Sequence, residues 1–170
     1  ARLRIVDPVL LQSDPADGRY PTLSAALADA RPGDTIFIKK SGGVVVEPAS
    51  WANPDGRVTI RPFPGYRPVL TLHPTADSDA SMIRILDGAV RFEGLRFALR
   101  ATGSDARGQA IAALTGPASV AFLDCAITLD QSGETPLAAV LIPESDAMRT
   151  PGQRAAPSAR SRWVRPYLTV

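Results

Sequence analysis

The stretch VRFEGLRFAL at residues 90–99 recurs as VAFLDCAITL at residues 120–129, thirty residues further along the chain. In both copies apolar residues alternate with polar or small ones, and the alternation slips by one position in the middle of the stretch. Alternation of period two is typical of strands with one buried face, and the slip predicts a corner between two strands. A unit of strand, corner and strand that recurs at this spacing predicts coils stacked into a solenoid.

The repeat extends towards the N-terminus with lower fidelity. Residues 83–88 align with residues 111–116 at an offset of 28, so that one turn of the later copy holds two extra residues. A weaker copy has expected strands at 58–61 and 69–72. Insertions confined to turns are typical of solenoids, and three or four coils are predicted before residue 145.

The composition fits one globular domain. Of the 170 residues 45% are hydrophobic, and no apolar run approaches the roughly 20 residues that a membrane helix needs. The net charge is +2 and the arginines are scattered along the chain, which does not favour nucleic-acid binding. A lone cysteine excludes an internal disulfide framework. We therefore expect a fold held by burial, without a membrane segment and without a nucleic-acid partner.

The start of the chain predicts a lead-in followed by a cap. Residues 1–19 are expected to form a strand and a loop. A short amphipathic helix is expected over 22–30, because Thr22 suits the N-cap, apolar residues follow at helical spacing, and Pro32 stands just beyond the end. A helix at this point would cover the open edge of the first coil, so we interpret it as an N-terminal cap.

Nearly everything from residue 35 to residue 142 reads as strand or turn. The expected strands are 35–39, 43–47, 57–61, 68–73, 81–86, 89–92, 94–99, 109–114, 119–123, 125–130 and 138–142. Residues 143–161 are rich in Pro, Ala, Ser and Arg and predict a flexible loop. Residues 162–170 then read as the start of a further coil that is cut short at the last residue.

Two stretches carry a resemblance to a known fold. The run YPTLSAALADARPGDTI at 20–36 and the run VTIRPFPGYRPVL at 58–70 resemble the first coils of right-handed parallel β-helix proteins of the pectin lyase-like superfamily. The resemblance covers roughly residues 20–142. It implies an all-β fold, a right-handed single-stranded parallel β-helix of about four or five coils with a short N-terminal capping helix.

The resemblance is specific for fold and uninformative for activity, because the superfamily contains polysaccharide lyases, hydrolases, epimerases, adhesins and modules with no known chemistry. The composition is closest to β-helix regions of large bacterial multidomain proteins, some of which carry a Ser/Thr protein kinase module. No kinase motif occurs in this chain, so any kinase would lie outside it. In a longer protein of this kind we expect an extracytoplasmic or cell-envelope location.

Outward positions of the repeat would carry any exposed site. The outward set is Thr59, Arg61, Arg84, Arg91, Arg96, Ala112, Ala121, Ala126, Thr128 and Asp130. Guanidinium groups suit carboxylated or sulfated sugars or phosphate, so Arg61, Arg84, Arg91 and Arg96 are candidate ligand-binding residues. The alternative is an ordinary solvated sheet face in a protein that uses Arg instead of Lys.

Glu93 and Asp124 are the one pair of acids at the predicted corner. If they share the corner position of successive coils, the two residues lie about 4.8 Å apart along the stack. Such a pair would suit a cation or a sugar, and the alternative is a solvated corner eased by nearby arginines. Trp51, Tyr66 and Trp163 would stack on sugar rings or, alternatively, pack at corners.

The inward positions predict the core. The expected ladders are Val90 over Val120, Phe92 over Phe122, and Leu95 over Cys125. Cys125 is therefore interpreted as a small buried hydrophobe and not as a nucleophile.

Three functions remain open from the sequence. The first is a non-catalytic module that binds a polysaccharide or an envelope component beside other domains of a longer chain, with no catalytic residue, metal or cofactor assigned. The second is a lyase or hydrolase acting on acidic polysaccharide, for which the resemblance implies calcium. The third is an assembly element that self-associates through an exposed C-terminal coil. We favour the non-catalytic module, because the outward positions carry arginine and alanine and not the stacked carboxylates that these enzymes use.

Overall fold

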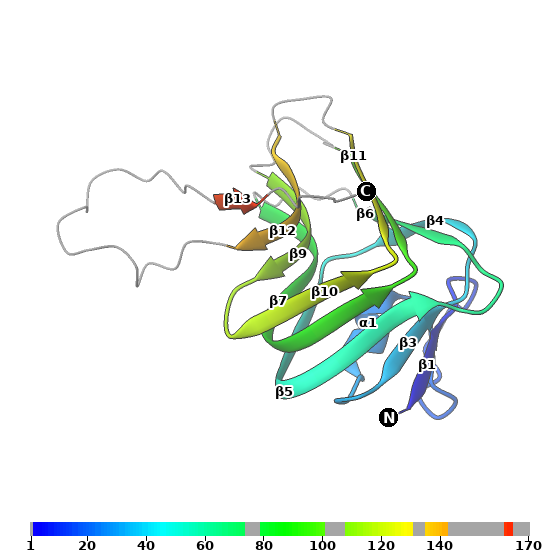
Figure 1. The fold of residues 1–170 in the computed structure, drawn as a ribbon. Coiled ribbons are helices and arrows are strands. Elements are labelled where there is room, and N and C mark those ends of the chain that lie inside the picture. Colours follow the sequence, from blue (N-terminus) through cyan, green and yellow to red (C-terminus); the bar gives the residue numbers. More distant parts are fainter. Residues whose placement is uncertain (1, 74–78, 101–107, 131–134, 143–161, 165–170) are drawn as a thin grey trace.

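The computed structural model is an all-β parallel solenoid of about four turns with one short helix at its start (Figure 1). It describes residues 2–73, 79–100, 108–130, 135–142 and 162–164. Successive turns stack in register, so that residues about thirty positions apart in the chain lie side by side on neighbouring strands. The solenoid predicted from the repeat is confirmed.

The first face of the solenoid is a ladder of parallel strands. It contains β1 (Leu3–Val6) with β2 (Arg19–Tyr20) beside it, β3 (Thr35–Ile38), the second halves of β5 (Ala49–Pro62) and β7 (Asp79–Glu93), and β10 (Ala118–Leu123). Their inward side chains form a continuous row, in which Ile36 pairs with Ile60, Ile60 with Phe92, and Phe92 with Phe122. The Phe92 and Phe122 rings stack with their centroids 5.1 Å apart.

The second face is a separate four-stranded sheet. It contains β4 (Gly42–Val46), β6 (Pro68–Leu72), β8 (Arg96–Arg100) and β11 (Ala126–Asp130). Its inward row runs from Val44 through Leu70 and Phe97 to Ile127. Phe97 meets Phe92 edge to face, with the ring centroids 5.2 Å apart, so the rows of the two faces join in the core.

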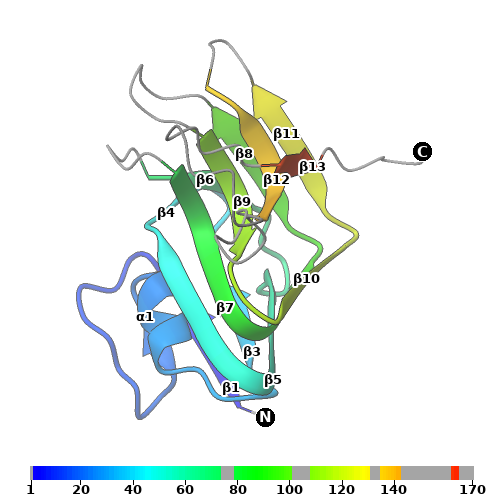
Figure 2. The same cartoon turned by 90° about the vertical axis from the view of Figure 1, so that its left-hand side faces the viewer.

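The third face is built from the first halves of β5 and β7, together with β9 (Gly108–Leu114) and β12 (Leu137–Ile142) (Figure 2). Beyond β12 lies β13 (Arg162–Val164), which pairs with it in the antiparallel sense. We expected residues 162–170 to begin a further parallel coil. The described part of that stretch instead runs against the direction of the strands before it, and the expected flexible loop at 143–161 lies outside the described residues.

The strands β5 and β7 each serve two faces without a break. The sequence predicted separate strands at 81–86 and 89–92, but β7 bends at Gly88 and stays continuous. Gly88 has a φ of +79°, and a Cβ atom there would lie 2.2 Å from the carbonyl oxygen of Asn53, so only glycine fits this close approach. Strand β5 turns the same corner, and its register relative to β7 shifts between Trp51 and Arg57. The sequence predicted only residues 57–61 of β5 and missed its first half. The other expected strands are confirmed with small differences at their ends.

The predicted helix is confirmed as α1 (Leu23–Ala28), which is shorter than the predicted 22–30. The Thr22 hydroxyl accepts a hydrogen bond from the amide of Ala25, as an N-cap residue does. The inward side chains Leu23, Ala26 and Leu27 are buried in the core, and the helix packs on β1, β2, β3 and β5. It therefore covers the first turn of the stack.

A buried ionic cluster that the sequence analysis did not predict connects α1 to the first strand. Arg4 on β1 is almost fully buried and donates hydrogen bonds to Asp34, over 2.8 Å, to Asp29 and to the Tyr20 hydroxyl. Asp34 also accepts from the backbone amides of Arg2 and Arg31. Burial alone would raise the pKa of Asp34, but these hydrogen bonds outweigh it and hold the pKa below its usual range.

One predicted register is wrong by a single residue. The alignment of 83–88 with 111–116 assumed an offset of 28, whereas Ile83 pairs with Ala112, an offset of 29. Because the side-chain period of a strand is two, this shift turns Ala112 from the predicted outward position into the core, where it is fully buried. The two glycines misled the alignment, since Gly116 lies against the Leu86 carbonyl and not beside Gly88.

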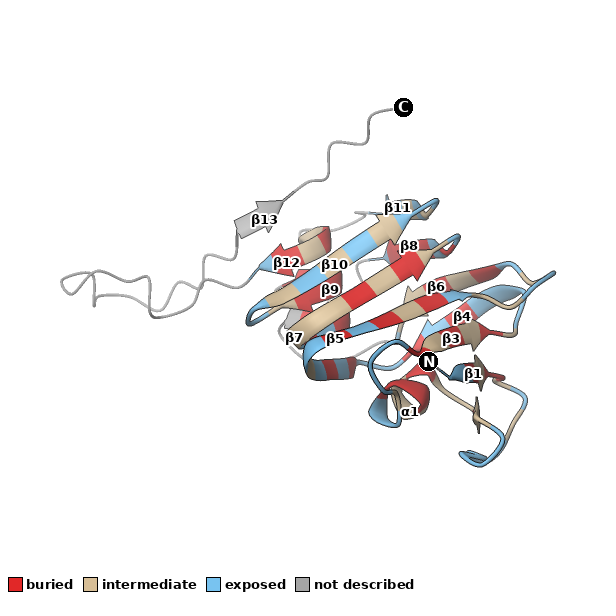
Figure 3. Cartoon of the chain, turned by 60° about the horizontal axis from the view of Figure 1, so that its bottom comes forward, coloured by how far each residue is buried: buried red, intermediate tan, exposed pale blue. Residues whose placement is uncertain are grey.

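The last turn of the first and second faces is the least covered part of the core (Figure 3). Phe92 and Phe97 are about 1% exposed, whereas their partners on β10 and β11, Phe122 and Ile127, are only partly buried. Cys125, predicted to be buried, is likewise only partly buried. Desolvation by its surroundings still raises the pKa of this thiol.

Candidate functional site

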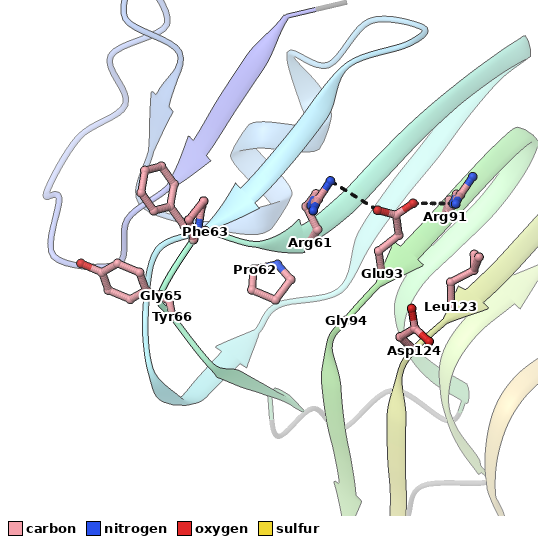
Figure 4. A pocket seen from close by; sticks show the side chains of 11 residues that line it. Arg61, Pro62, Phe63, Gly65, Tyr66, Arg91, Glu93, Gly94, Leu123 and Asp124 are labelled. Carbon is pink, nitrogen blue, oxygen red and sulfur yellow. Dashed lines mark ion pairs between the residues drawn. The ribbon is translucent and has the colours of Figure 1, made fainter. Parts of the chain in front are cut away.

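The corner between the first and second faces carries a pocket of about 470 Å³ (Figure 4). It is lined by Arg61, Pro62, Phe63, Pro64, Gly65, Tyr66, Arg91, Glu93, Gly94, Leu123 and Asp124. These residues come from the ends of β5, β7 and β10 and from the turn that links β5 to β6. Three successive turns of the solenoid thus meet here, which brings together four of the six residues predicted as ligand-binding.

Glu93 is held between two arginines on the wall of the pocket. Its Oε2 lies 3.5 Å from Nη1 of Arg61, and its Oε1 lies 2.7 Å from Nε of Arg91. The Arg91 N–H does not point at the oxygen, so this contact is an ion pair and not a hydrogen bond. The Arg61 and Arg91 side chains are 49% and 37% exposed, so both guanidinium groups also face solvent.

Aromatic rings brace the other side of the pocket. Phe63 meets Phe37 and Tyr66 edge to face, with both pairs of centroids 5.9 Å apart. The Arg61 guanidinium lies over the Phe37 ring at 5.5 Å, which favours one orientation of the arginine. Of the three aromatic residues predicted to contact sugars, Tyr66 lines the pocket.

The predicted stacking of Glu93 on Asp124 is wrong. In the observed register Glu93 pairs with Leu123, and Asp124 takes the place that Gly94 holds one turn earlier. Both corner residues have a left-handed backbone, with φ of +61° at Gly94 and +50° at Asp124. Asp is one of the few residues besides glycine that visit this region, so backbone geometry accounts for Asp124 at the corner. It still borders the pocket.

A second hollow of about 360 Å³ adjoins the first and shares Tyr66, Gly94 and Asp124 with it. Arg67 and Arg96 lie on its wall, together with Cys125. The predicted residue Arg96 therefore borders the same corner from the second face. Arg67 was missed as a candidate, although the sequence placed it in a turn. The repeat pattern does not show that this turn folds against the corner of the next coil, so Arg67 was not recognised as a candidate.

Two predicted candidates lie elsewhere. Arg84 is exposed on the third face, where it pairs with Ser50 and Ala113, and it takes no part in the pocket. Trp51 is 3% exposed and belongs to the core, so it offers no surface to a sugar. The Trp163 side chain lies outside the described part of the structure.

The corner offers polar and charged binding groups around two adjoining hollows. Four arginines, two carboxylates and the Tyr66 ring line the two hollows. Within the described ranges no group of three or more His, Cys, Asp or Glu side chains is arranged to hold a metal ion. No helix in the described residues is long and apolar enough to cross a membrane.

Comparisons add no relative to this picture. The chain matches no protein-family model, no curated protein and no solved structure.

Proposed function

We propose that the chain is a non-catalytic recognition module whose corner pocket binds a carbohydrate ligand, a polysaccharide or a component of a cell envelope. The composition of the pocket supports this. A ring such as that of Tyr66 offers a flat apolar surface to a sugar, and guanidinium and carboxylate groups donate to and accept from its hydroxyls. Guanidinium groups add affinity for any carboxylate, sulfate or phosphate on the ligand.

The observation that carries the proposal is the arrangement of Glu93 between Arg61 and Arg91. Each carboxylate oxygen lies within ion-pair distance of one guanidinium group, which favours a common arrangement of the three side chains. A polar cluster that is already assembled suits recognition, because less reordering is needed when a ligand binds.

Three broader points belong to the same proposal. We infer that the solenoid winds right-handed, since crossovers between parallel strands are right-handed in about 98% of cases. The resemblance at residues 20–36 and 58–70 favours kinship with pectin lyase-like β-helices. It also favours a role within a longer bacterial envelope protein, in some cases attached to a Ser/Thr kinase module.

The test is direct binding of the 170-residue chain to a panel of neutral and acidic polysaccharides, with and without calcium. New reducing or unsaturated chain ends are followed in the same samples. The variant Arg61→Gln with Arg91→Gln removes both charges that hold Glu93. Because it leaves Glu93 without its ion pairs, we expect it to weaken binding about tenfold or more.

Arg84→Gln is the matched control, since it removes an exposed arginine from the third face, away from the pocket. Binding that depends on Arg61 and Arg91 but not on Arg84 would support the corner as the site. Equal weakening in the control, or no binding to any member of the panel, would contradict it. Release of new chain ends would replace the proposal by the polysaccharide lyase or hydrolase alternative.

A further inference from the structure

Among the described residues, the last turn of the solenoid has two strand edges without a neighbour. In the described part of the chain β10 pairs only with β7, and β11 pairs only with β8. The inward side chains of β11 are accordingly uncovered, so that Leu129 is 37% exposed while its partner Leu99 on β8 is fully buried. We call β10 and β11, with these side chains, the open end.

The open end lacks several of the features that protect an edge strand. Neither β10 nor β11 contains lysine or proline, and their pairing with β7 and β8 runs without a register shift. Strand edges that are not shielded in such ways pair readily with another strand. By contrast, the free edge of β12 is covered by β13, and α1 with β2 covers the first turn.

We propose that a second copy of this chain covers the open end, with β11 of each copy paired antiparallel about a two-fold axis at Thr128. In this register Thr128 faces Thr128 of the second copy, and Ile127 faces Leu129. Residues opposite one another in an antiparallel pair project to the same side of the sheet. The half-buried Ile127 and the exposed Leu129 therefore extend the apolar row of one interior into that of the other.

Charge complementarity favours this pairing of like strands. Asp130 is the only charged residue of β11, and the proposed register sets it opposite Ala126 of the second copy. Ala126 pairs with the exposed Arg96 on β8, and the short alanine side chain leaves Arg96 free to reach across it. Two Asp130–Arg96 contacts, related by the two-fold axis, thus form between opposite charges of the two copies. A closed two-fold pair is also the commonest form of protein oligomer.

The first experiment is sedimentation equilibrium of the 170-residue chain over a wide range of concentrations. We expect a reversible monomer–dimer equilibrium. Leu129→Lys sets a charge on the inward row and should raise the dimer dissociation constant at least about tenfold. A chain that stays monomeric at every concentration overturns the proposal, and so does a dimer that Leu129→Lys leaves unchanged.

The second experiment tests the register by charge exchange. Asp130→Arg should weaken the dimer, and adding Arg96→Asp to the same chain should restore it, since opposite charges again meet across the axis. Arg100→Asp is the control for the rescue. Arg100 forms the neighbouring exposed ion pair with Asp130 within one copy, at 3.5 Å, and it should not rescue. Rescue by Arg100→Asp, or by neither change, overturns this register.

A cysteine placed at the proposed two-fold axis tests the β11 pairing independently. In a Cys125→Ser background, Thr128→Cys should form an intermolecular disulfide under mild oxidation, because opposite Cβ atoms in such a pair lie about 5 Å apart. Ala98→Cys is the matched control, one strand further from the axis at the same level. It should not crosslink. Equal crosslinking of both variants, or of neither, contradicts pairing through β11.

Discussion

At the first turn of the solenoid Leu23, Ala26 and Leu27 of α1 complete the core, whereas at the last turn Phe122 and Ile127 lie half exposed on strands with one free edge. The two regions are built from the same kind of alternating strand. They differ in whether another layer follows. In a stack where each turn contacts only its neighbours, burial of a repeated position depends on the next layer more than on its own sequence. Stability should therefore be concentrated towards the first turns.

The largest test of this difference compares equivalent phenylalanines on neighbouring turns. Phe92→Ala should lower the free energy of unfolding by roughly 3–5 kcal/mol, because it leaves a cavity in a closed layer. Phe122→Ala should cost about 1–2 kcal/mol, since its ring is only partly buried. Urea denaturation of both variants, at a low protein concentration that keeps the chain monomeric, gives the two free energies of unfolding. Equal losses would mean that the last turn is covered in solution.

The buried cluster at the first turn provides the next test. Arg4→Met should cost about 3 kcal/mol, because it leaves the buried Asp34 carboxylate without its cationic partner. Arg19→Met is the control, since Arg19 is 42% exposed and only approaches Asp7 at 3.6 Å. It should change stability by less than about 1 kcal/mol. Thermal unfolding of the two variants checks the difference, and a similar loss in both would remove the special role of the cluster.

The pH dependence of stability tests the same cluster, with a smaller expected effect. Hydrogen bonds from Tyr20 and Arg4 lower the pKa of Asp29, and the pKa of Asp34 is also lowered. Between the ordinary carboxyl pKa of 3.8 and the lowered pKa values of the folded state, the unfolded chain binds more protons than the folded chain, so stability should fall as the pH drops from about 3.8 through the folded-state values. Denaturation between pH 6 and pH 2 measures the slope. Arg4→Met should flatten it, and an unchanged slope would assign the loss to other carboxylates.

The smallest expected effect concerns the corner itself. Asp124→Gly should leave stability unchanged or slightly higher, and Asp124→Ala should lower it by about 1 kcal/mol, because φ there is +50°. Asp130→Ala, an exposed acid in a regular strand, should change it by less than about 0.5 kcal/mol. If Asp124→Gly destabilises while Asp124→Ala does not, the carboxylate and not the backbone explains this residue.

The strand pattern could be predicted because each turn repeats an alternation that only one register satisfies. Val90 over Val120 and Phe92 over Phe122 follow directly from the offset of thirty. The prediction failed where Gly88 was aligned with Gly116, because the two glycines contact different backbone groups. The predicted register was therefore wrong by one residue, and Ala112 points inward and not outward. The strand β9 is buried on both faces, so its burial follows no alternation that would reveal the register.

The candidate site was predicted in part for a similar reason. Arg61, Arg91, Glu93 and Asp124 all stand next to the repeat corner, so the repeat brings them together. The contribution of Phe63, Tyr66 and Arg67 depends on how the turn after β5 folds back, which no periodicity describes. Arg4 was missed because a buried arginine in a strand has the same sequence pattern as an exposed one until its acidic partners, Asp29 and Asp34, are known, and both are more than twenty residues away.

The unbroken course of β5 and β7 has a consequence for how the molecule opens. Each strand carries one hydrogen-bonded ladder around a bend, so the first and third faces share their backbone hydrogen bonds. The second face is a separate ladder of four strands joined to the rest through turns and side chains. Its amides can exchange with solvent deuterium in a local opening that leaves the other ladder intact. The main hydrophobic core, which both sheets share, is thus enclosed by two units of amide protection.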